Sequence, residues 1–246
     1  LLQKDIHLDN FLLKEGSVFL IDTGDLEHHQ HNADGVDSVN SLRNLALFFA
    51  QFPIENDALV PALYEYYRQQ RPSADLSEDI AVFAALLRKK RALRLKIVFK
   101  KLYIETSENT IVRDWNHFIV YKRTMESTAL QAFVQAPDTF IENGKMIKAG
   151  SSTTVALIEI DNKQYVVKRY NMTSLWYRVR RLFRPSRAWV CWRNAHMLEM
   201  LGISTPKPLL MMEWRYGPLR REAYLLCEYI VGEDALQLLK KEPINS

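Results

Sequence analysis

The fold is decided by residues 145–170, which read KMIKAGSSTTVALIEIDNKQYVVKRY. Three apolar runs in this stretch are separated by a small polar segment at 149–154 and by the triplet DNK at 161–163. Short apolar runs bounded by glycine, serine, asparagine and aspartate are typical of β-strands joined by turns. We therefore expect strands over 145–148, 155–160 and 164–170, arranged as an antiparallel meander.

Helices and further strands are expected after the meander. The basic, aromatic segment 174–183 and the segment 186–201 are both predicted to be helical, and Gly202 follows the second where a helix C-cap belongs. The apolar runs 209–214 and 223–229 are predicted to be strands. This half of the chain should be dominated by antiparallel strands.

The residues before the meander are predicted to be mainly helical. Apolar residues recur with a helical period over 39–49, and further helices are expected over 57–69 and from Pro72 into a basic stretch. Ahead of them, the runs 11–13 and 18–21 flank a turn and indicate a small hairpin. The chain as a whole is therefore predicted to be of the α+β class.

Composition narrows the class of protein. Hydrophobic residues make up 48% and charged residues 25%, which is typical of a globular chain with a sizeable core. No apolar run approaches the roughly 18 residues needed to span a bilayer. Two cysteines, Cys191 and Cys227, suggest neither a disulfide framework nor a metal motif. We expect a cytoplasmic protein, at most peripheral on the inner face of the membrane, and, because Leu1 is not a Met, a piece of a longer chain.

Three polar residues near the start have the order and spacing of the catalytic loop and metal-binding turn of a kinase. Asp5 and Asn10 are five residues apart, and Asp22 follows the apolar run 18–21. The reaction needs a carboxylate to orient the attacking hydroxyl and oxygen ligands for the metal on the phosphates. Such residues are also common turn formers and strand ends. Three of them in this order, with an apolar strand between the last two, favour the catalytic interpretation.

The second half of the chain contains candidate donors for the phosphates of a nucleotide. A small polar loop at 150–152 precedes one strand, and Lys168 ends the run VVK in the next. A kinase places its phosphate-covering loop and its phosphate-binding lysine in this order. Alone, such a lysine would be read as an outward-facing residue of an exposed strand. The upstream loop and the run LLCEYI at 225–230, which is similar to a kinase hinge strand, favour the phosphate-binding interpretation.

These motifs resemble those of the lipopolysaccharide core heptose and Kdo kinases, which have a protein-kinase-like fold. The segment 5–10 fits the D-x-H-x-x-N form of the catalytic loop, and the run DTG at 22–24 fits the metal-binding turn with Thr in place of Phe. Three later runs resemble this family more closely than eukaryotic protein kinases: RPSRAW at 184–189, WRNAH at 192–196 and GISTPKP at 202–208. The resemblance covers almost the whole chain, although Gln3 stands where many relatives carry His.

The resemblance implies an ATP- and Mg²⁺-dependent kinase that phosphorylates a sugar hydroxyl of the lipopolysaccharide core. Asp5 would orient the acceptor hydroxyl, and Asn10 and Asp22 would hold Mg²⁺. Lys168 would bind the phosphates of the nucleotide. The other implied nucleotide-binding residues are Gly150, Ser151 and Ser152 in the loop and Glu228 and Ile230 in the hinge.

One expected partner is displaced. In the kinases a helix glutamate pairs with the phosphate-binding lysine, and the spacing to Gly202 puts that position near Cys191. Glu199 lies about two turns further along the helix. Either Glu199 or another group replaces the missing carboxylate, or this copy is impaired.

The order of the two motif sets is reversed relative to a kinase, in which the nucleotide lobe comes first. Tandem copies and a permuted single domain would both explain this. We favour residues 1–124 as the helical C-terminal lobe of a first kinase-like domain, 125–139 as a linker, and 140–246 as the β-rich N-terminal lobe of a second. Asp5 and Lys168 would then belong to different active sites, and this piece alone would have little activity.

Basic residues gather between Arg88 and Lys101, where eight Lys and Arg lie without an acid although the net charge is only +4. Such a run indicates an anionic partner, such as a glycolipid or a membrane surface, or simply a solvated helix face. No nucleic-acid motif accompanies it, so nucleic acid is not an expected partner. A pseudokinase-type regulatory or glycolipid-binding module without turnover stays open as the alternative function, and a purely basic binding protein ranks third.

Overall fold

The computed structural model describes residues 2–3, 6–24, 26–27, 38–71, 76, 80–171, 184–217 and 219–232. The chain divides into two compact units, Leu1–Lys100 with Met200–Gly202, and Lys101–Glu199 with Ile203–Ser246. Each unit has a hydrophobic core of its own. The helix predicted over 174–183 lies outside the described residues.

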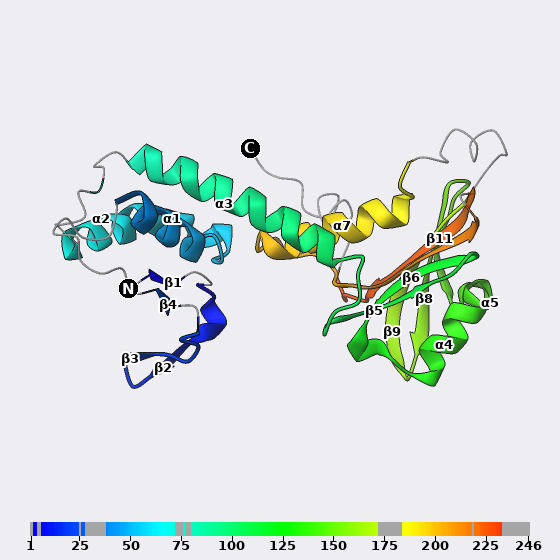
Figure 1. Ribbon diagram of the computed structural model, residues 1–246. Helices are drawn as coiled ribbons and strands as arrows, with labels where there is room; N and C mark the ends of the chain where they lie inside the picture. The colour runs from blue at the N-terminus through cyan, green and yellow to red at the C-terminus, as the bar shows by residue number, and fades with distance from the viewer. Residues whose placement is uncertain are drawn as a thin grey trace, which may run out of the picture. The chain divides into compact units, whose positions relative to one another are not determined.

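The core of the first unit is built by three helices (Figure 1). The rings of Tyr64 and Phe83 stack with centroids 4.7 Å apart, and Phe83 is fully buried. The helical period that predicted helices over 39–49 and 57–69 is confirmed, with a 3-10 turn ahead of the second. The elements are α1 (Ser38–Phe49), η2 (Ile54–Leu59), α2 (Val60–Gln70) and α3 (Ile80–Lys101).

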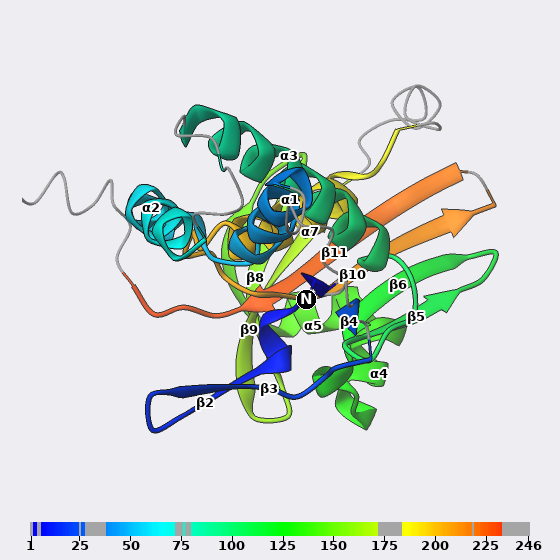
Figure 2. The same cartoon turned by 60° about the vertical axis from the view of Figure 1, so that its left-hand side comes forward.

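A small hairpin precedes these helices, as expected (Figure 2). Strands β2 (Phe11–Lys14) and β3 (Ser17–Leu20) pair in an antiparallel register that joins Phe11 to Leu20. Glu15 and Gly16 form the turn with φ of 51° and 78°, a backbone region in which glycine is unstrained. Short elements flank the hairpin, namely β1 (Leu2–Gln3), which pairs with β4 (Leu26–Glu27), and the 3-10 turn η1 (Leu8–Asn10).

The second unit is organised around a seven-stranded antiparallel sheet with the order β5-β6-β10-β11-β9-β8-β7. The meander expected at 145–170 is confirmed as β7, β8 and β9. Its second turn has positive φ at Asp161 and Asn162, 50° and 59°, which suits a two-residue hairpin loop. The strands are β5 (Asn109–Arg113), β6 (His117–Lys122), β7 (Lys145–Ala149), β8 (Thr153–Ile160), β9 (Lys163–Tyr170), β10 (Pro208–Tyr216) and β11 (Leu219–Glu228).

Helices cover both faces of this sheet (Figure 1). On one face α4 (Thr128–Gln135) and α5 (Pro137–Asn143) bury Leu130 and Phe133 in the main core. On the other lies α7 (Arg187–Met200), whose Trp189 packs against Phe118 of β6 with ring centroids 4.9 Å apart. The predicted C-cap is confirmed, because Gly202 has φ of 72° and the amide of Ile203 donates to the carbonyl of Leu198.

The structure divides the chain earlier than we expected. The break between the units falls at Lys100 and Lys101, not at the predicted linker 125–139. Most of that segment is α4 and the start of α5, which the buried side chains of Leu130 and Phe133 fix to the sheet. Strands β5 and β6, which we assigned to the residues before the linker, extend the sheet because Val120 pairs with Met211 of β10. The mixed helix and sheet class is as predicted, while the identity of the units as lobes of two kinase copies stays a prediction.

Candidate nucleotide and metal sites

Lys168 lies in the centre of the β8-β9-β11 part of the sheet. It is paired with Val155 of β8 on one side and with Leu225 of β11 on the other. The adjacent Val167 and Leu226 are fully buried against α4 and α5. Because successive side chains of a strand alternate between faces, Lys168 points to the opposite face, the side of α7.

An apolar surface continues from Lys168 toward the end of β11. Val166 of β9 is paired with Leu157 of β8 and with Cys227 of β11. Val166 is two residues from Lys168 on the same strand, so it and its two partners lie on the same face of the sheet as Lys168. Burial raises the pKa of the Cys227 thiol to about 11, and the nearby charge of Lys168 acts against this shift. The thiol is therefore neutral, and the row from Val166 to Cys227 is apolar.

Asn171, the residue directly after β9, holds the loop between β7 and β8 by hydrogen bonds. Its side-chain nitrogen donates to the carbonyl oxygens of Gly150 and Ser151 at 3.1 and 3.3 Å, and its backbone amide donates to Ser152 at 3.1 Å. Arg169 in turn donates to the Asn171 side-chain oxygen at 2.7 Å. Three consecutive carbonyl oxygens of the loop are thus turned toward β9.

The backbone amides of this loop, unlike its carbonyl oxygens, are not turned toward Asn171. The Gly150 amide donates to the Thr153 carbonyl at 3.1 Å. Within the described part of the chain, the amides of Ser151 and Ser152 donate to no acceptor, and both residues are exposed. Outward amides on a loop whose carbonyls are tied back form a concavity suited to an anion. Asn171, which causes this arrangement, was missed by sequence reasoning, although it lies only three residues after Lys168.

The predicted hinge residues differ in what they can offer. The Glu228 amide donates to the Lys207 carbonyl at 3.0 Å, and the Glu228 carboxylate accepts the Lys207 amide at 2.9 Å. Both groups of Glu228 are therefore occupied. The backbone of Ile230 forms no hydrogen bond to another described residue, so it is the better candidate for an adenine contact.

The structure places Cys191, and no carboxylate, opposite the end of β9. Its Sγ lies 3.2 Å from the Tyr170 hydroxyl, and burial together with this contact raises the pKa of Tyr170. Lys168 forms no ion pair with any residue of the described ranges. The position inferred from the spacing to Gly202 thus faces the sheet, but it carries a thiol.

Glu199 forms no ion pair with Lys168 among the residues that the structure describes. Burial raises the pKa of its carboxyl group. The charges that act on it belong to Lys122, Lys207, Glu108 and Glu228, which lie at the hinge end of the sheet, and Lys168 is not one of them.

In the first unit, the hairpin brings two of the predicted acidic-site residues to one end. The Ile21 amide donates to the Asn10 carbonyl at 2.9 Å, which closes the hairpin beyond its last strand pair, and Asp22 is the residue that follows Ile21. The Asp22 carboxylate accepts the Gly24 amide at 3.1 Å and so forms a tight turn. Asp5 lies outside the described residues.

Asn10 and Asp22 offer the oxygen ligands that Mg²⁺ prefers. Mg²⁺ is commonly bound by one or two carboxylates together with waters and substrate phosphates. Among the residues that the structure describes, no group of three His, Cys, Asp or Glu gathers as a self-sufficient metal site. A magnesium ion held by Asn10 and Asp22 jointly with a nucleotide stays a prediction.

Gln51, in the turn that follows α1, was not foreseen. Its side-chain oxygen accepts the Leu8 amide at 2.9 Å, and its nitrogen donates to the Ile6 carbonyl at 2.7 Å. These two bonds fix the loop that leads from Asp5 to Asn10. No local pattern could have signalled this residue, because it lies more than forty positions away from the loop.

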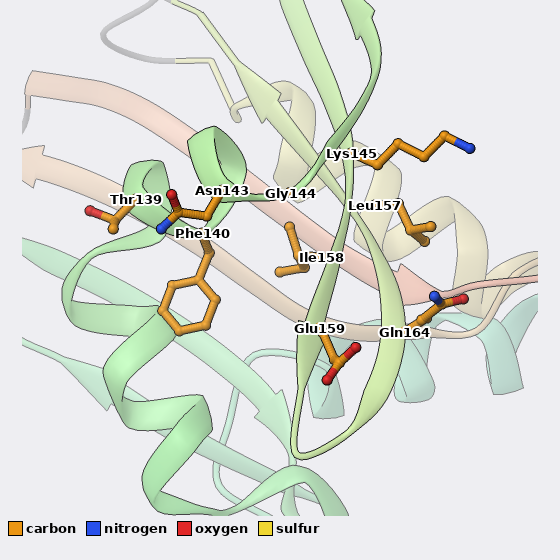
Figure 3. Close-up of a pocket in the computed structure, with 9 residues that line it drawn as sticks. All are labelled: Thr139, Phe140, Asn143, Gly144, Lys145, Leu157, Ile158, Glu159 and Gln164. Carbon is orange, nitrogen blue, oxygen red and sulfur yellow. The ribbon is translucent and has the colours of Figure 1, made fainter.

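A hollow of about 490 Å³ lies at the edge of the seven-stranded sheet of the second unit, between α5 and the hairpin β8–β9 (Figure 3). Phe140 and Ile158 form its apolar part, and Glu159 and Gln164 lie near its other end. Lys145 and Glu159 are its charged residues, so their charges balance. Lys168 does not line it, and this hollow is separate from the candidate nucleotide site.

Comparison with known proteins adds little to this description. No protein-family model and no curated protein matches the chain. A solved structure of WaaP in complex with acyl carrier protein is similar, with 19% sequence identity and a TM-score of 0.31, over 43% of this chain and 39% of that one. The chain thus spans about two fifths of the length of that relative.

Within the described residues, no helix combines the length and the apolar character needed to cross a membrane. The basic run 88–101 lies on α3. Arg91 is engaged with Asp57, to which it donates two hydrogen bonds of 2.6 Å. Five of the eight cations are exposed, namely Arg88, Lys89, Lys96, Lys100 and Lys101.

Proposed function

We propose that this chain belongs to an ATP- and Mg²⁺-dependent phosphotransferase that acts on a sugar hydroxyl of the lipopolysaccharide core, a heptose or Kdo. The observation that carries the proposal is the arrangement on one sheet of the second unit. A loop with outward amides, Lys168 and an apolar surface that ends at the hinge follow one another on the face toward α7. A bound ATP would lie in this order, with its phosphates at the loop and Lys168 and its adenine at the hinge.

Each candidate residue has a role in this reaction. The acceptor oxygen would form a bond to the terminal phosphorus while the bond between that phosphorus and ADP breaks, and Asp5 would take the hydroxyl proton. Asn10 and Asp22 would hold Mg²⁺, which neutralises charge on the phosphates. Lys168 and the loop amides would bind the phosphates that stay with ADP. In the tandem arrangement that we favour, Asp5 and Lys168 serve different copies.

The proposed acceptor rests on the sequence resemblance alone. The runs at 184–189, 192–196 and 202–208 resemble the lipopolysaccharide core kinases. The exposed cations of α3 would suit a phosphorylated glycolipid or the anionic face of a membrane. A location on the cytoplasmic side of the inner membrane follows from this substrate.

One observation favours a second function, a pseudokinase that binds nucleotide or glycolipid without turnover. Lys168 has no carboxylate partner among the described residues, and Cys191 stands at the position where that partner was expected. A kinase lysine that lacks its glutamate is poorly held for catalysis but can still bind phosphate. This alternative concerns the second unit, whereas Asp22 and Asn10 of the first keep the pattern of an active site.

The test is ATP-dependent transfer of phosphate to dephosphorylated lipopolysaccharide core by the full protein. Wild type is compared with Asp5→Ala and Lys168→Ala, and with Lys163→Ala, an exposed lysine of the same strand, as the matched control. Loss of transfer in Asp5→Ala assigns catalysis to the first unit, and the Lys168 result decides whether the second contributes. Unchanged transfer in both variants would exclude the kinase interpretation.

A further inference from the structure

A second cation lies beside the loop of the proposed nucleotide site. Arg187, the first residue of α7, is exposed, and its Nη1 donates to the Thr153 hydroxyl oxygen at 3.2 Å. Its guanidinium carbon lies 5.2 Å from the centroid of the Tyr170 ring. Helix α7 thus brings a positive charge to the start of β8, directly after the loop.

The register of β9 orders this cation relative to the rest of the site. Tyr170 lies two residues beyond Lys168 on the same face, a span of about 7 Å along a strand. Glu228, at the hinge, is paired with Tyr165, which lies on the other side of Lys168. Along β9 the order is therefore hinge, Lys168 and then Arg187.

Neither Lys168 nor Arg187 is neutralised by a carboxylate among the residues that the structure describes. Arg169 follows Lys168 on β9 and points to the opposite face, and it contrasts with both cations because its guanidinium lies 2.9 Å from the Asp138 carboxylate. An arginine without a carboxylate partner next to outward loop amides is well suited to bind a phosphate, whose oxygens accept the parallel N–H groups of guanidinium.

We infer that Arg187 binds the terminal phosphate of a nucleoside triphosphate whose inner phosphates lie at Lys168. The inference rests on the proposed function, because it takes the nucleotide to run from the hinge toward the loop. A diphosphate laid in the same way ends at Lys168 and does not reach Arg187. Arg187 therefore makes the site distinguish a triphosphate from a diphosphate.

The experiment measures the dissociation constants of ATP and ADP, with Mg²⁺, for wild type and four variants by calorimetry. Arg187→Gln should weaken ATP about tenfold, the scale of one charge-assisted hydrogen-bond pair, and leave ADP within about threefold. Arg187→Lys, which keeps the charge, should recover part of the loss. Lys168→Ala should weaken both nucleotides. Thr153→Val removes the hydroxyl that Arg187 contacts but keeps the cation, so it should bind ATP as wild type does.

Other outcomes overturn the inference in distinguishable ways. Equal losses for ATP and ADP in Arg187→Gln, or no loss, would remove the terminal-phosphate role while the nucleotide site stands. A Thr153→Val variant that reproduces Arg187→Gln would show that the arginine only supports the loop. Failure of wild type to bind either nucleotide would reject the proposed function of this unit and the inference with it. Thermal unfolding of each variant identifies any general loss of structure.

Discussion

The side-chain nitrogen of Gln51 lies 2.7 Å from the carbonyl oxygen of Ile6. The other end of the same side chain accepts the Leu8 amide. Gln51 thus holds two backbone groups of the loop between Asp5 and Asn10, and it does so from the turn that follows α1. Under the proposed function this loop presents Asp5 to the acceptor, and such an anchor would matter because small displacements of a catalytic group are costly.

We expect Gln51→Leu to slow phosphate transfer about tenfold with little change in the KM for ATP, since a lost hydrogen bond to a positioned loop is worth about 1 kcal/mol or more. Hydrogen exchange of the Leu8 amide should accelerate at the same time. Gln70→Leu, at an exposed position of the next helix, is the matched control. Faster exchange at Leu8 with an unchanged transfer rate would show that this anchor has no part in the reaction.

Substitution of Asn171 should change the nucleotide affinities in a different way from substitution of Arg187. In Asn171→Ala the loop carbonyls lose their donors, so the loop amides lose their fixed direction. We expect the affinity for ATP and for ADP to fall alike, by about five- to tenfold, the equivalent of one or two neutral hydrogen bonds. Asn143→Ala, in the separate hollow beside α5, should leave both affinities unchanged. A loss confined to ATP would contradict the role assigned to Asn171.

Local sequence explains why the meander and the hairpins could be predicted. Asp161 and Asn162 supply the positive φ that a two-residue turn needs, and this turn fixes the register of β8 and β9 without reference to the rest of the chain. The helical period over 39–49 likewise depends on neighbours within a few turns.

The pairing of strands that are far apart in the sequence could not be predicted from local sequence. Val120 of β6 pairs with Met211 of β10, and nothing near either strand selects that partner. Any apolar strand satisfies the same local pattern, and the choice is made by the packing of the whole sheet. The segment that we assigned to a linker became α4 and part of α5 for the same reason, because Leu130 and Phe133 find their burial only against distant strands. The contacts of Gln51 and Asn171 belong to this class of non-local information.

Gly144, at the junction of α5 and β7, should tolerate no side chain. A Cβ at this position would lie 2.6 Å from the Leu157 carbonyl oxygen and 3.0 Å from that of Phe140, and neither backbone group can swing away. We expect Gly144→Ala to destabilise the second unit by about 1–3 kcal/mol, the usual cost of overpacking. Gly232→Ala is the matched control, because a Cβ there meets nothing within 4 Å. Urea unfolding of the two variants should separate them, and equal stabilities would contradict the close approach.

His196 of α7 should make the second unit sensitive to acid. Only 6% of the residue is exposed, and its Nδ1 lies 2.9 Å from the Trp192 carbonyl oxygen, so this nitrogen carries the proton of a neutral ring. Burial lowers the pKa of His196 to about 4, helped by Lys122 and opposed by the bond to Trp192 and by Glu108. The unfolded chain, with an ordinary pKa of about 6.5, binds a proton more readily than the folded one.

Stability from this group is therefore complete above about pH 6.5 and is lost as the pH falls toward 4, by about 2 kcal/mol at pH 5 and about 3 kcal/mol at pH 4. His196→Gln, which cannot take up the proton, should lose less stability over the same range, and the difference between the two proteins in urea unfolding isolates the histidine from other titrating groups. An NMR titration of the His196 ring gives the folded-state pKa directly. A value near 6.5 would mean that the imidazolium is well accommodated, and the acid sensitivity would then have to come from other residues.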